Sequence, residues 1–127
     1  MSVHVSWIDD THTAILREFE GSWTWDEFYA SQDEVNSKLR SVTHPVHQVL
    51  DFSQTKSLPP NTLTHLRNSG RNMPDNRGKS LVVTQSMFYL QMYRVLDRMF
   101  PTLTKRVVIV ATREAALEKI RPAEARA

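Results

Sequence analysis

The sequence predicts an α/β fold with a mixed five-stranded sheet covered by four helices. The first strand of this sheet is expected to be antiparallel and the others parallel. Two observations predict this fold. Two short alternating segments open the chain, and from residue 24 onward each amphipathic helical pattern is followed by a short strand pattern. Because strand–helix–strand crossovers are right-handed and join parallel neighbours, the last four strands are expected to be parallel.

The first third of the chain predicts a hairpin and then a long helix. Residues 3–7 alternate between apolar and polar side chains, residues 9–12 have turn chemistry, and residues 13–20 form a second strand pattern. Thr24 and Glu27 have the spacing of a capping box at a helix N-terminus. The helix is expected to run to about residue 42, because Pro45 prevents its continuation. Its expected inner face is made by Trp25, Phe28, Val35, Leu39 and Val42.

The rest of the chain predicts three further strands, each followed by a helix. The strands are residues 46–52, 80–84 and 106–111, and the last two are apolar runs typical of strands buried on both faces. Asn61, Ser86 and Thr112 are the expected caps of helices at 62–73, 87–100 and 113–120. The expected inner faces are Leu63, Leu66 and Met73; Phe88, Met92, Val95, Leu96 and Met99; and Ala116, Leu117 and Ile120.

Composition points to one soluble domain over residues 1–120, with a frayed tail at 121–127. The chain has no cysteine, which excludes disulfides and thiolate metal sites and suits a reducing, cytoplasmic compartment. No signal peptide is visible, and the longest apolar run, residues 107–111, is far shorter than the roughly 20 residues of a membrane span. The net charge of +2 is small, so the basic residues Arg67, Arg71, Arg77 and Lys79 are interpreted as a solvated surface and no nucleic-acid partner is expected.

The sequence contains no recognisable catalytic motif. Nucleophile-elbow, P-loop, dinucleotide-binding and H-E-x-x-H patterns are all absent, and the three glycines leave little material for a phosphate cradle. His44 and His47 are three residues apart, but Pro45 between them is incompatible with a helical metal-binding pair. No metal, no cofactor and no enzymatic activity are therefore predicted.

Position in the sheet favours a binding rim at the carboxyl ends of the strands, where open α/β sheets bind ligands. Asp51 ends one parallel strand, and hydroxyl and amide side chains gather after it and after the next strand. The candidate rim residues are Asp51, Ser53, Thr55, Ser57, Asn61, Thr62 and Ser86, with Thr112 facing the same edge. The competing interpretation makes Ser86 and Thr112 plain helix caps and Asp51 a hydrogen-bond acceptor within its loop.

A second candidate site lies on the helix at 87–100. Phe88, Met92, Met99 and Phe100 could line a pocket for an apolar ligand or simply belong to the core. Tyr89 and Tyr93, on the adjoining face, are candidates for a protein interface. Phe88, Tyr89, Met92 and Tyr93 are therefore predicted as a pocket wall or a contact surface.

The order of elements resembles the STAS domain, the fold of bacterial anti-sigma factor antagonists. The resemblance covers about residues 3–120 and is carried by the opening hairpin, by Asp51-Phe52-Ser53, by Thr112-Arg113-Glu114-Ala115-Ala116-Leu117, and by Gly21-Ser22-Trp23-Thr24-Trp25, which resembles an uncharacterised variant group. It implies a regulatory module phosphorylated by a partner kinase on a serine of a D-S-S-G motif. Pro59-Pro60-Asn61-Thr62 stands at that place here, so the usual phosphorylation switch is not expected; Ser57 and Thr62 are the nearby hydroxyls.

The leading hypothesis is a non-enzymatic STAS-like module that binds a protein partner, such as a regulatory kinase or a sensor protein, through the rim and the second helix. Homodimerisation through an edge strand or the tyrosine-bearing helix face stays open. One alternative is a carrier or sensor of a small apolar or acidic ligand. The other is an enzyme of unrecognised type.

Overall fold

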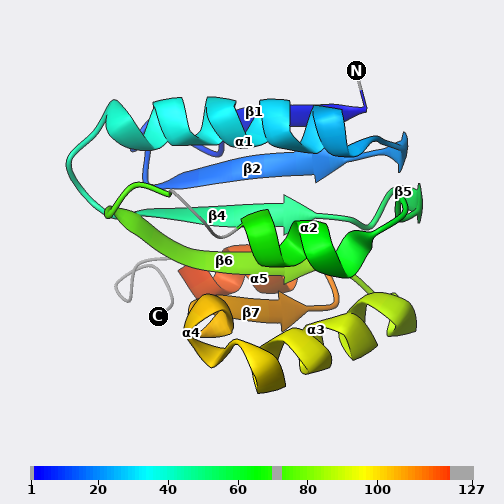
Figure 1. Ribbon diagram of the computed structural model, residues 1–127. Helices are drawn as coiled ribbons and strands as arrows, with labels where there is room; N and C mark the ends of the chain where they lie inside the picture. The colour runs from blue at the N-terminus through cyan, green and yellow to red at the C-terminus, as the bar shows by residue number, and fades with distance from the viewer. Residues whose placement is uncertain (1, 70–72, 121–127) are drawn as a thin grey trace.

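The structure is a computed structural model that describes residues 2–69 and 73–120 (Figure 1). The predicted frayed tail at 121–127, Arg71 of the basic group, and residues 70–72 of the predicted second helix lie outside the described residues. Along the chain the elements are β1 (Val3–Trp7), β2 (Ala14–Phe19), β3 (Gly21–Ser22), α1 (Trp25–Arg40), β4 (Val46–Asp51), β5 (Thr55–Ser57), α2 (Thr62–Ser69), β6 (Arg77–Val83), α3 (Met87–Met99), α4 (Pro101–Thr104), β7 (Val107–Val110) and α5 (Arg113–Ile120).

The predicted mixed sheet is confirmed. Its strand order is β1-β2-β4-β6-β7, with β1 antiparallel to β2 and every other neighbouring pair parallel. Asp51 pairs with Val83, and Val83 pairs with Val110, so β4, β6 and β7 end in register. The residues that follow these strands therefore share one edge of the sheet, as the crossover rule requires.

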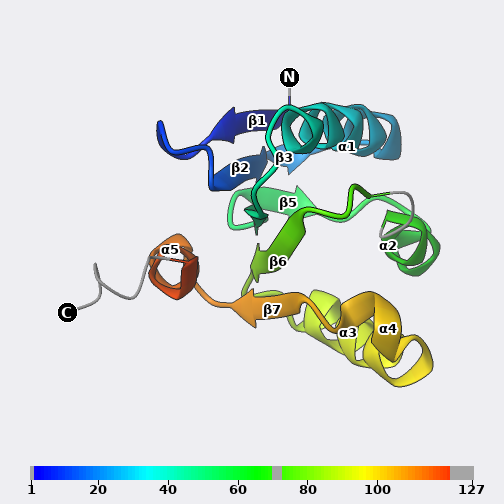
Figure 2. The same cartoon turned by 90° about the vertical axis from the view of Figure 1, so that its left-hand side faces the viewer.

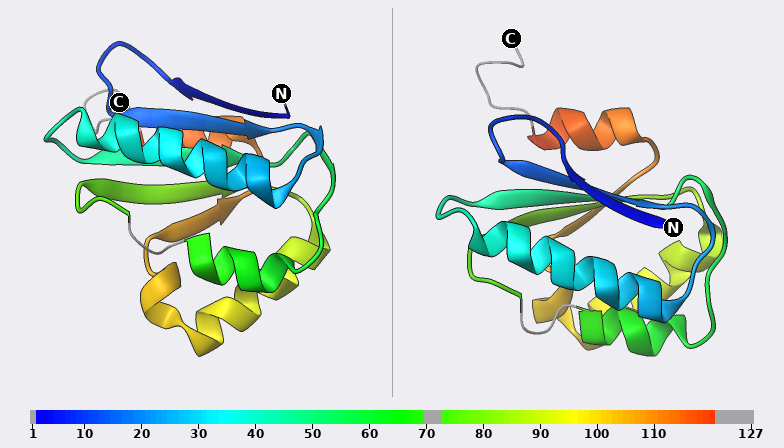
Figure 3. Two further views of the ribbon diagram at one scale, coloured as in Figure 1. Left: turned by 45° about the horizontal axis from the view of Figure 1, so that its top comes forward. Right: turned by 90° about the horizontal axis from the view of Figure 1, so that it is seen from above.

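Helices cover the two faces of this sheet unequally. Helices α1, α2, α3 and α4 lie on one face, here called the helical face, and α5 alone lies on the other, here called the α5 face (Figure 2, Figure 3). The core on the helical face is rich in aromatic residues: Phe19, Trp23, Phe28, Phe52 and Tyr89. The core on the α5 face is aliphatic, with Val49, Leu81, Val83, Val110 and Ala116.

Local signals place α1 where the sequence predicts it to begin. The Thr24 hydroxyl accepts a hydrogen bond from the Glu27 backbone N–H at 3.2 Å, and the Glu27 carboxylate accepts one from the Thr24 N–H at 3.2 Å. This reciprocal pair is the predicted capping box. At the other end, the Asn76 side-chain amide donates to the carbonyls of Leu39, Val42 and His44, which satisfies groups that the helix terminus leaves without partners.

Several short elements are absent from the sequence-based prediction. Strands β3 and β5 pair in parallel as a separate two-stranded sheet, within a region expected to be loop, and α4 is a fifth helix where Pro101 was expected only to end α3. Proline is favourable in the first turn of a helix, so the residue that stops α3 also starts α4. Strand β6 begins at Arg77, three residues before the predicted start. On α2, Leu63 was expected to belong to the core but is exposed.

The predicted inner face of α3 is confirmed at Leu96 and wrong at Phe88, Val95 and Met99. Phe88, Val95 and Met99 are 58%, 42% and 61% exposed, whereas Tyr89 and Leu96 are buried. The physical reason is that the apolar arc of this helix is broad, running from Val95 and Phe88 through Leu96 to Tyr93, so its periodicity does not determine which part of the arc packs against the sheet. The structure turns the tyrosines toward the sheet and the Phe88 stripe toward solvent.

Candidate functional site

The structure places Asp51 at the predicted edge, but its carboxylate is already engaged. Asp51 Oδ2 accepts a hydrogen bond from Arg113 Nε at 2.7 Å, and Oδ1 accepts one from the Ser53 backbone N–H at 2.9 Å. Arg113 also donates to Glu18 at 2.9 Å. Burial alone would raise the pKa of Asp51, but the hydrogen bonds from Ser53 and Arg113 outweigh it, and the pKa lies below its usual value. This cluster anchors the start of α5 to the sheet.

Most other rim residues also have structural partners. The hydroxyls of Ser86 and Thr112 accept hydrogen bonds from the Tyr89 and Ala115 backbone N–H groups, at 3.2 and 3.1 Å, and so cap α3 and α5. Thr55 donates to the Phe19 carbonyl and Thr62 to the Pro59 carbonyl.

Four members of the predicted rim, Ser53, Ser57, Asn61 and Ser86, are exposed. The backbone of Asn61 has a φ of 63°, in the left-handed region rather than the extended conformation of an ordinary N-cap. The sequence therefore located the edge correctly, and the use of that edge for binding stays a prediction.

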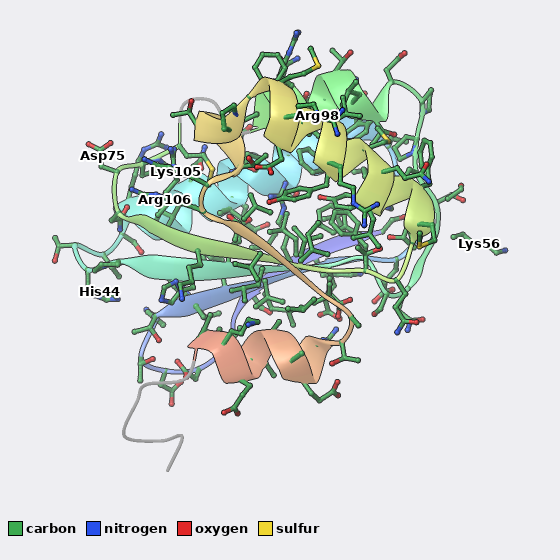
Figure 4. All side chains as sticks on the ribbon, turned by 90° about the horizontal axis from the view of Figure 1, so that it is seen from below. His44, Lys56, Asp75, Arg98, Lys105 and Arg106 are labelled. Atoms are coloured by element: carbon green, nitrogen blue, oxygen red, sulfur yellow. The ribbon has the colours of Figure 1, made fainter. Side chains whose placement is uncertain are left out.

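A cavity of about 340 Å³ lies elsewhere, between the helical face of the sheet and helices α2, α3 and α4, with α1 contributing Phe28 and Gln32 to its lining. This volume is at the lower end of the range of small-molecule sites, about 300–1,000 Å³. Its walls are mainly apolar and include Phe28, Leu50, Phe52, Leu66, Val82, Tyr89, Tyr93, Leu96, Leu103 and Val107. The most exposed lining residues are Thr102, Lys105 and Arg106, which mark its mouth at the end of the sheet where β6 and β7 begin. Figure 4 shows Lys105 and Arg106 at that end, with Asp75 near them.

Arg17 forms part of the inner wall and is almost completely buried, with 1% of its surface exposed. It projects from the middle of β2 toward α1. Its Nε donates to Ser31 Oγ at 2.9 Å, its Nη1 to the side-chain oxygens of Gln32 and Gln48 at 2.9 and 3.1 Å, and its Nη2 to the Phe28 carbonyl at 3.0 Å. All of these acceptors are neutral.

The positive charge of Arg17 has no anionic partner among the described residues, whose ion pairs involve other side chains. The guanidinium carbon lies 4.5 Å from the centre of the Phe28 ring and 5.3 Å from that of Phe19, and these aromatic faces give partial compensation. Burial lowers the pKa of Arg17 to about 9, which still leaves the side chain protonated at neutral pH. The inner wall therefore holds a desolvated cation without a counter-ion.

Two neighbouring groups add unused donors to this wall. Gln48 turns its oxygen toward Arg17, because a guanidinium offers only donors, and its amide N–H₂ then points away. Within residues 2–69 and 73–120, neither this amide nitrogen nor the hydroxyl of Tyr89 has a hydrogen-bond acceptor, although Gln48 and Tyr89 are each only 6% exposed. Burial, and then the nearby Tyr93, raise the pKa of Tyr89, so its hydroxyl stays protonated and able to donate.

Sequence reasoning missed the cavity and its polar wall, although a signal was present. Arg17 lies two residues from both Ile15 and Phe19, so the alternation of a strand places all three on the inward face. Gln48 occupies the same kind of position in β4. A charged or amide side chain at an inward strand position is a departure from the core pattern, and such departures are typical of functional sites.

Comparison with known proteins adds no assignment: no protein-family model matches the chain, and no curated protein matches it. Over the described ranges, no helix is both long and apolar enough to cross a membrane. No group of three or more histidine or acidic side chains placed to hold a metal ion occurs in that part of the chain.

Proposed function

We propose that this chain is a non-enzymatic module that carries or senses a small molecule in the cavity beneath α2, α3 and α4. The observation that supports the proposal is a hollow of about 340 Å³ with mainly apolar walls and a few buried polar side chains, among them Arg17 and Gln48. This combination is characteristic of small-molecule sites. Protein interiors are otherwise close-packed, and a large void in a core carries a cost in stability that a bound ligand removes.

The chemistry of the lining supports binding rather than catalysis. General acid–base catalysis most often uses an imidazole or a carboxylate within hydrogen-bonding reach of the reacting group. The described residues that line the cavity include no aspartate, glutamate or histidine. Their ionisable members are arginine, lysine and tyrosine, and a buried tyrosine with a raised pKa is a hydrogen-bond donor at neutral pH.

A direct test is to titrate isotope-labelled protein with octanol, a neutral apolar probe, and to follow the side-chain signals of the cavity wall by NMR. We expect saturable shifts at Leu50, Val82 and Leu96 and none at Val49 or Leu81 on the α5 face. The control is Val82→Phe, which narrows the cavity and should abolish the shifts. Native mass spectrometry of freshly purified protein is a second readout, since a co-purifying small molecule supports the proposal. Absence of wall shifts up to millimolar octanol would contradict it.

A second candidate function is the partner-binding module that the STAS resemblance implies, located in the cytoplasm because a chain without cysteine suits a reducing compartment. The observation that favours it is the stripe of exposed apolar side chains on α3, formed by Met87, Phe88, Val95 and Met99. Exposed methionine and aromatic side chains are enriched at protein interfaces. The test compares cross-linked partners of the wild type with those of a Phe88→Ser, Met99→Ser variant, and a partner retained by both argues against the stripe.

A further inference from the structure

We infer that the ligand of this cavity is a medium-sized monocarboxylic acid whose carboxylate is bound by Arg17 and Gln48 at the inner wall and whose apolar body extends toward the mouth. This inference rests on the proposed function and specifies its ligand. Three features of the cavity carry it: a buried charge, a set of free donors, and the path of the apolar walls.

The buried charge determines the sign of the ligand. An isolated ion removed from water is costly unless an opposite charge accompanies it. Arg17 is 1% exposed and has only neutral hydrogen-bond acceptors among the described residues. An anion in the cavity would supply the missing counter-charge in a water-poor site, where Coulomb attraction is strongest.

The free donors determine the kind of anion. A guanidinium has five N–H donors, and four hydrogen bonds from Arg17 are accounted for, which leaves one N–H on Nη2. The Gln48 amide and the Tyr89 hydroxyl are further donors that line the same cavity. The Arg17 N–H and the Gln48 amide belong to side chains that are hydrogen-bonded to each other, and this pair matches the two oxygens of one carboxylate. A phosphate group carries nearly two negative charges and three acceptor oxygens, so a single buried cation suits it poorly.

The walls determine the rest of the ligand. Arg17, Leu50 and Val82 are register neighbours on adjacent strands, so the lining runs from Arg17 across the sheet through Leu50 and Val82, and Leu96 of α3 also belongs to it. Contact with these side chains favours an aliphatic or aromatic body, and the volume of about 340 Å³ limits its size. Octanoic acid and phenylpropionic acid are suitable probes of this class.

The mouth also favours an acid, by a different mechanism. Arg77, Lys105 and Arg106 lie where the cavity opens, and Arg106 donates to the Arg77 carbonyl at 2.6 Å. Among the described residues, two acidic side chains lie on this side: Asp75 (Figure 4), and Asp97, which accepts a hydrogen bond from the lining residue Thr104 at 2.6 Å. Exposed cations of this kind accelerate the entry of an anion without holding it firmly, because water and salt screen them. We therefore assign affinity to Arg17 and the rate of association to the mouth.

The first experiment needs no variant. Calorimetric titration at neutral pH compares octanoic acid with octanol, and phenylpropionic acid with phenylpropanol. We expect each acid to bind about 10- to 100-fold more tightly than its alcohol, since hydrogen bonds to charged groups are the stronger class. Equal affinities for acid and alcohol overturn the inference while the proposed function stands. If neither member of either pair binds, both fail.

The decisive variant is Gln48→Glu, which has the same shape and places a carboxylate within hydrogen-bonding distance of Arg17 Nη1. This internal counter-ion should occupy the guanidinium and repel an acid. We expect octanol binding to be retained and the preference for octanoic acid to be lost. Undiminished acid preference in Gln48→Glu overturns the inference. Arg17→Met is the complementary variant, with the same expected loss of preference, and circular dichroism checks that it folds.

The matched control reverses the charges at the mouth in a Lys105→Glu, Arg106→Glu variant. We expect slower association and a weaker salt dependence for octanoic acid, with the acid preference at equilibrium reduced by less than about threefold. Loss of the preference in this variant, with retention in Gln48→Glu, places the carboxylate at the mouth and overturns the assignment to Arg17. Stopped-flow fluorescence of the native tryptophans gives the association rates.

Discussion

At the scale of single residues, two arginines show how differently the same side chain behaves in two settings. Arg113 is partly exposed and pairs with the carboxylates of Asp51 and Glu18. Arg17 is buried, and the side chains that surround it are neutral or aromatic. The first is a structural anchor whose charge is compensated, whereas the second retains a charge that a ligand can use.

The uncompensated charge of Arg17 predicts the effect of an isosteric substitution on stability. Gln48→Glu replaces a neutral acceptor 3.1 Å from Nη1 with a charged one. We expect the free energy of unfolding to rise by about 1–2 kcal/mol, because the gain from a charged hydrogen bond exceeds the cost of burying the new carboxylate beside a cation. Urea denaturation measures the change.

The control for this prediction is Asn36→Asp. Asn36 is also buried on the helical side, but its side-chain oxygen accepts from the Gln32 amide and not from a guanidinium. The same type of substitution there should lower the free energy of unfolding. Equal effects of the two substitutions would contradict the idea that Arg17 lacks a counter-ion.

The Asp51–Arg113 pair predicts a pH dependence. The pKa of Asp51 in the folded protein lies below its unfolded value of 3.8, so the folded state favours the ionised form. Its contribution to stability is complete above pH 3.8 and is lost as the pH falls through the lower folded pKa. Asp51→Asn should therefore reduce the free energy of unfolding at neutral pH by about 1 kcal/mol, a modest figure because Arg113 is partly exposed.

The measurement is the difference between wild type and Asp51→Asn in urea denaturation across an acid series. We expect the difference to shrink below pH 3.8, since the side-chain amide of the variant does not titrate. A difference that stays constant into strong acid would show that the stabilisation does not come from the ionised carboxylate.

At the scale of elements, α3 separates what a sequence pattern can and cannot determine. Its start at Met87, its cap Ser86 and its end near Pro101 all follow from local chemistry and agree with the structure. Its orientation depends on which part of its broad apolar arc packs against the sheet. That choice is made by tertiary packing, where Tyr89 contacts Phe52 and Leu96 is buried.

The orientation of α3 is testable with two truncations. Leu96 is 5% exposed and Phe88 is 58% exposed. We expect Leu96→Ala to lower the free energy of unfolding by about 2 kcal/mol, the low end for a buried leucine because it borders the cavity. Phe88→Ala should change it by less than about 0.5 kcal/mol. Thermal and urea denaturation give both values. A loss at Phe88 as large as that at Leu96 would support the sequence-based face, which contains both residues.

The same contrast explains the candidate site. The carboxyl edge with Asp51, Ser86 and Thr112 followed from chain topology, because successive crossovers leave no other arrangement. The cavity did not follow, because a void arises where side chains from separate elements fail to meet, and no single segment encodes it. Arg17 and Gln48 were the local signals, since a charged and an amide side chain interrupt the inward faces of β2 and β4.

At the scale of the whole molecule, the cores on the two faces of the sheet are packed differently. The α5 face is covered by one short helix and packs densely, with Leu81, Val83 and Ala116 each 0% exposed. The helical face carries four helices (Figure 3). All four contribute residues to the lining of the cavity that lies between them and the sheet. The molecule therefore has a filled core on the α5 face and a hollow core on the helical face.

This difference in packing predicts that the same substitution at two adjacent residues has different effects on the free energy of unfolding. Val82 lines the cavity on the helical face, and Val83 packs on the α5 face. Valine to phenylalanine at position 82 adds volume to a hollow, so we expect the free energy of unfolding to stay within about 1 kcal/mol of the wild type. The same change at position 83 overfills a dense core and should cost about 1–3 kcal/mol.

Ligand binding gives the two variants a second readout with the opposite order. Octanoic acid should raise the melting temperature of Val83→Phe as it does that of the wild type, because a ligand that binds only the folded state stabilises it by mass action. It should leave Val82→Phe unchanged, since the ring occupies the space that the apolar body needs. Differential scanning fluorimetry with and without the acid measures both shifts. Similar destabilisation by both substitutions, with equal ligand shifts, would mean that the helical face is as densely filled as the α5 face.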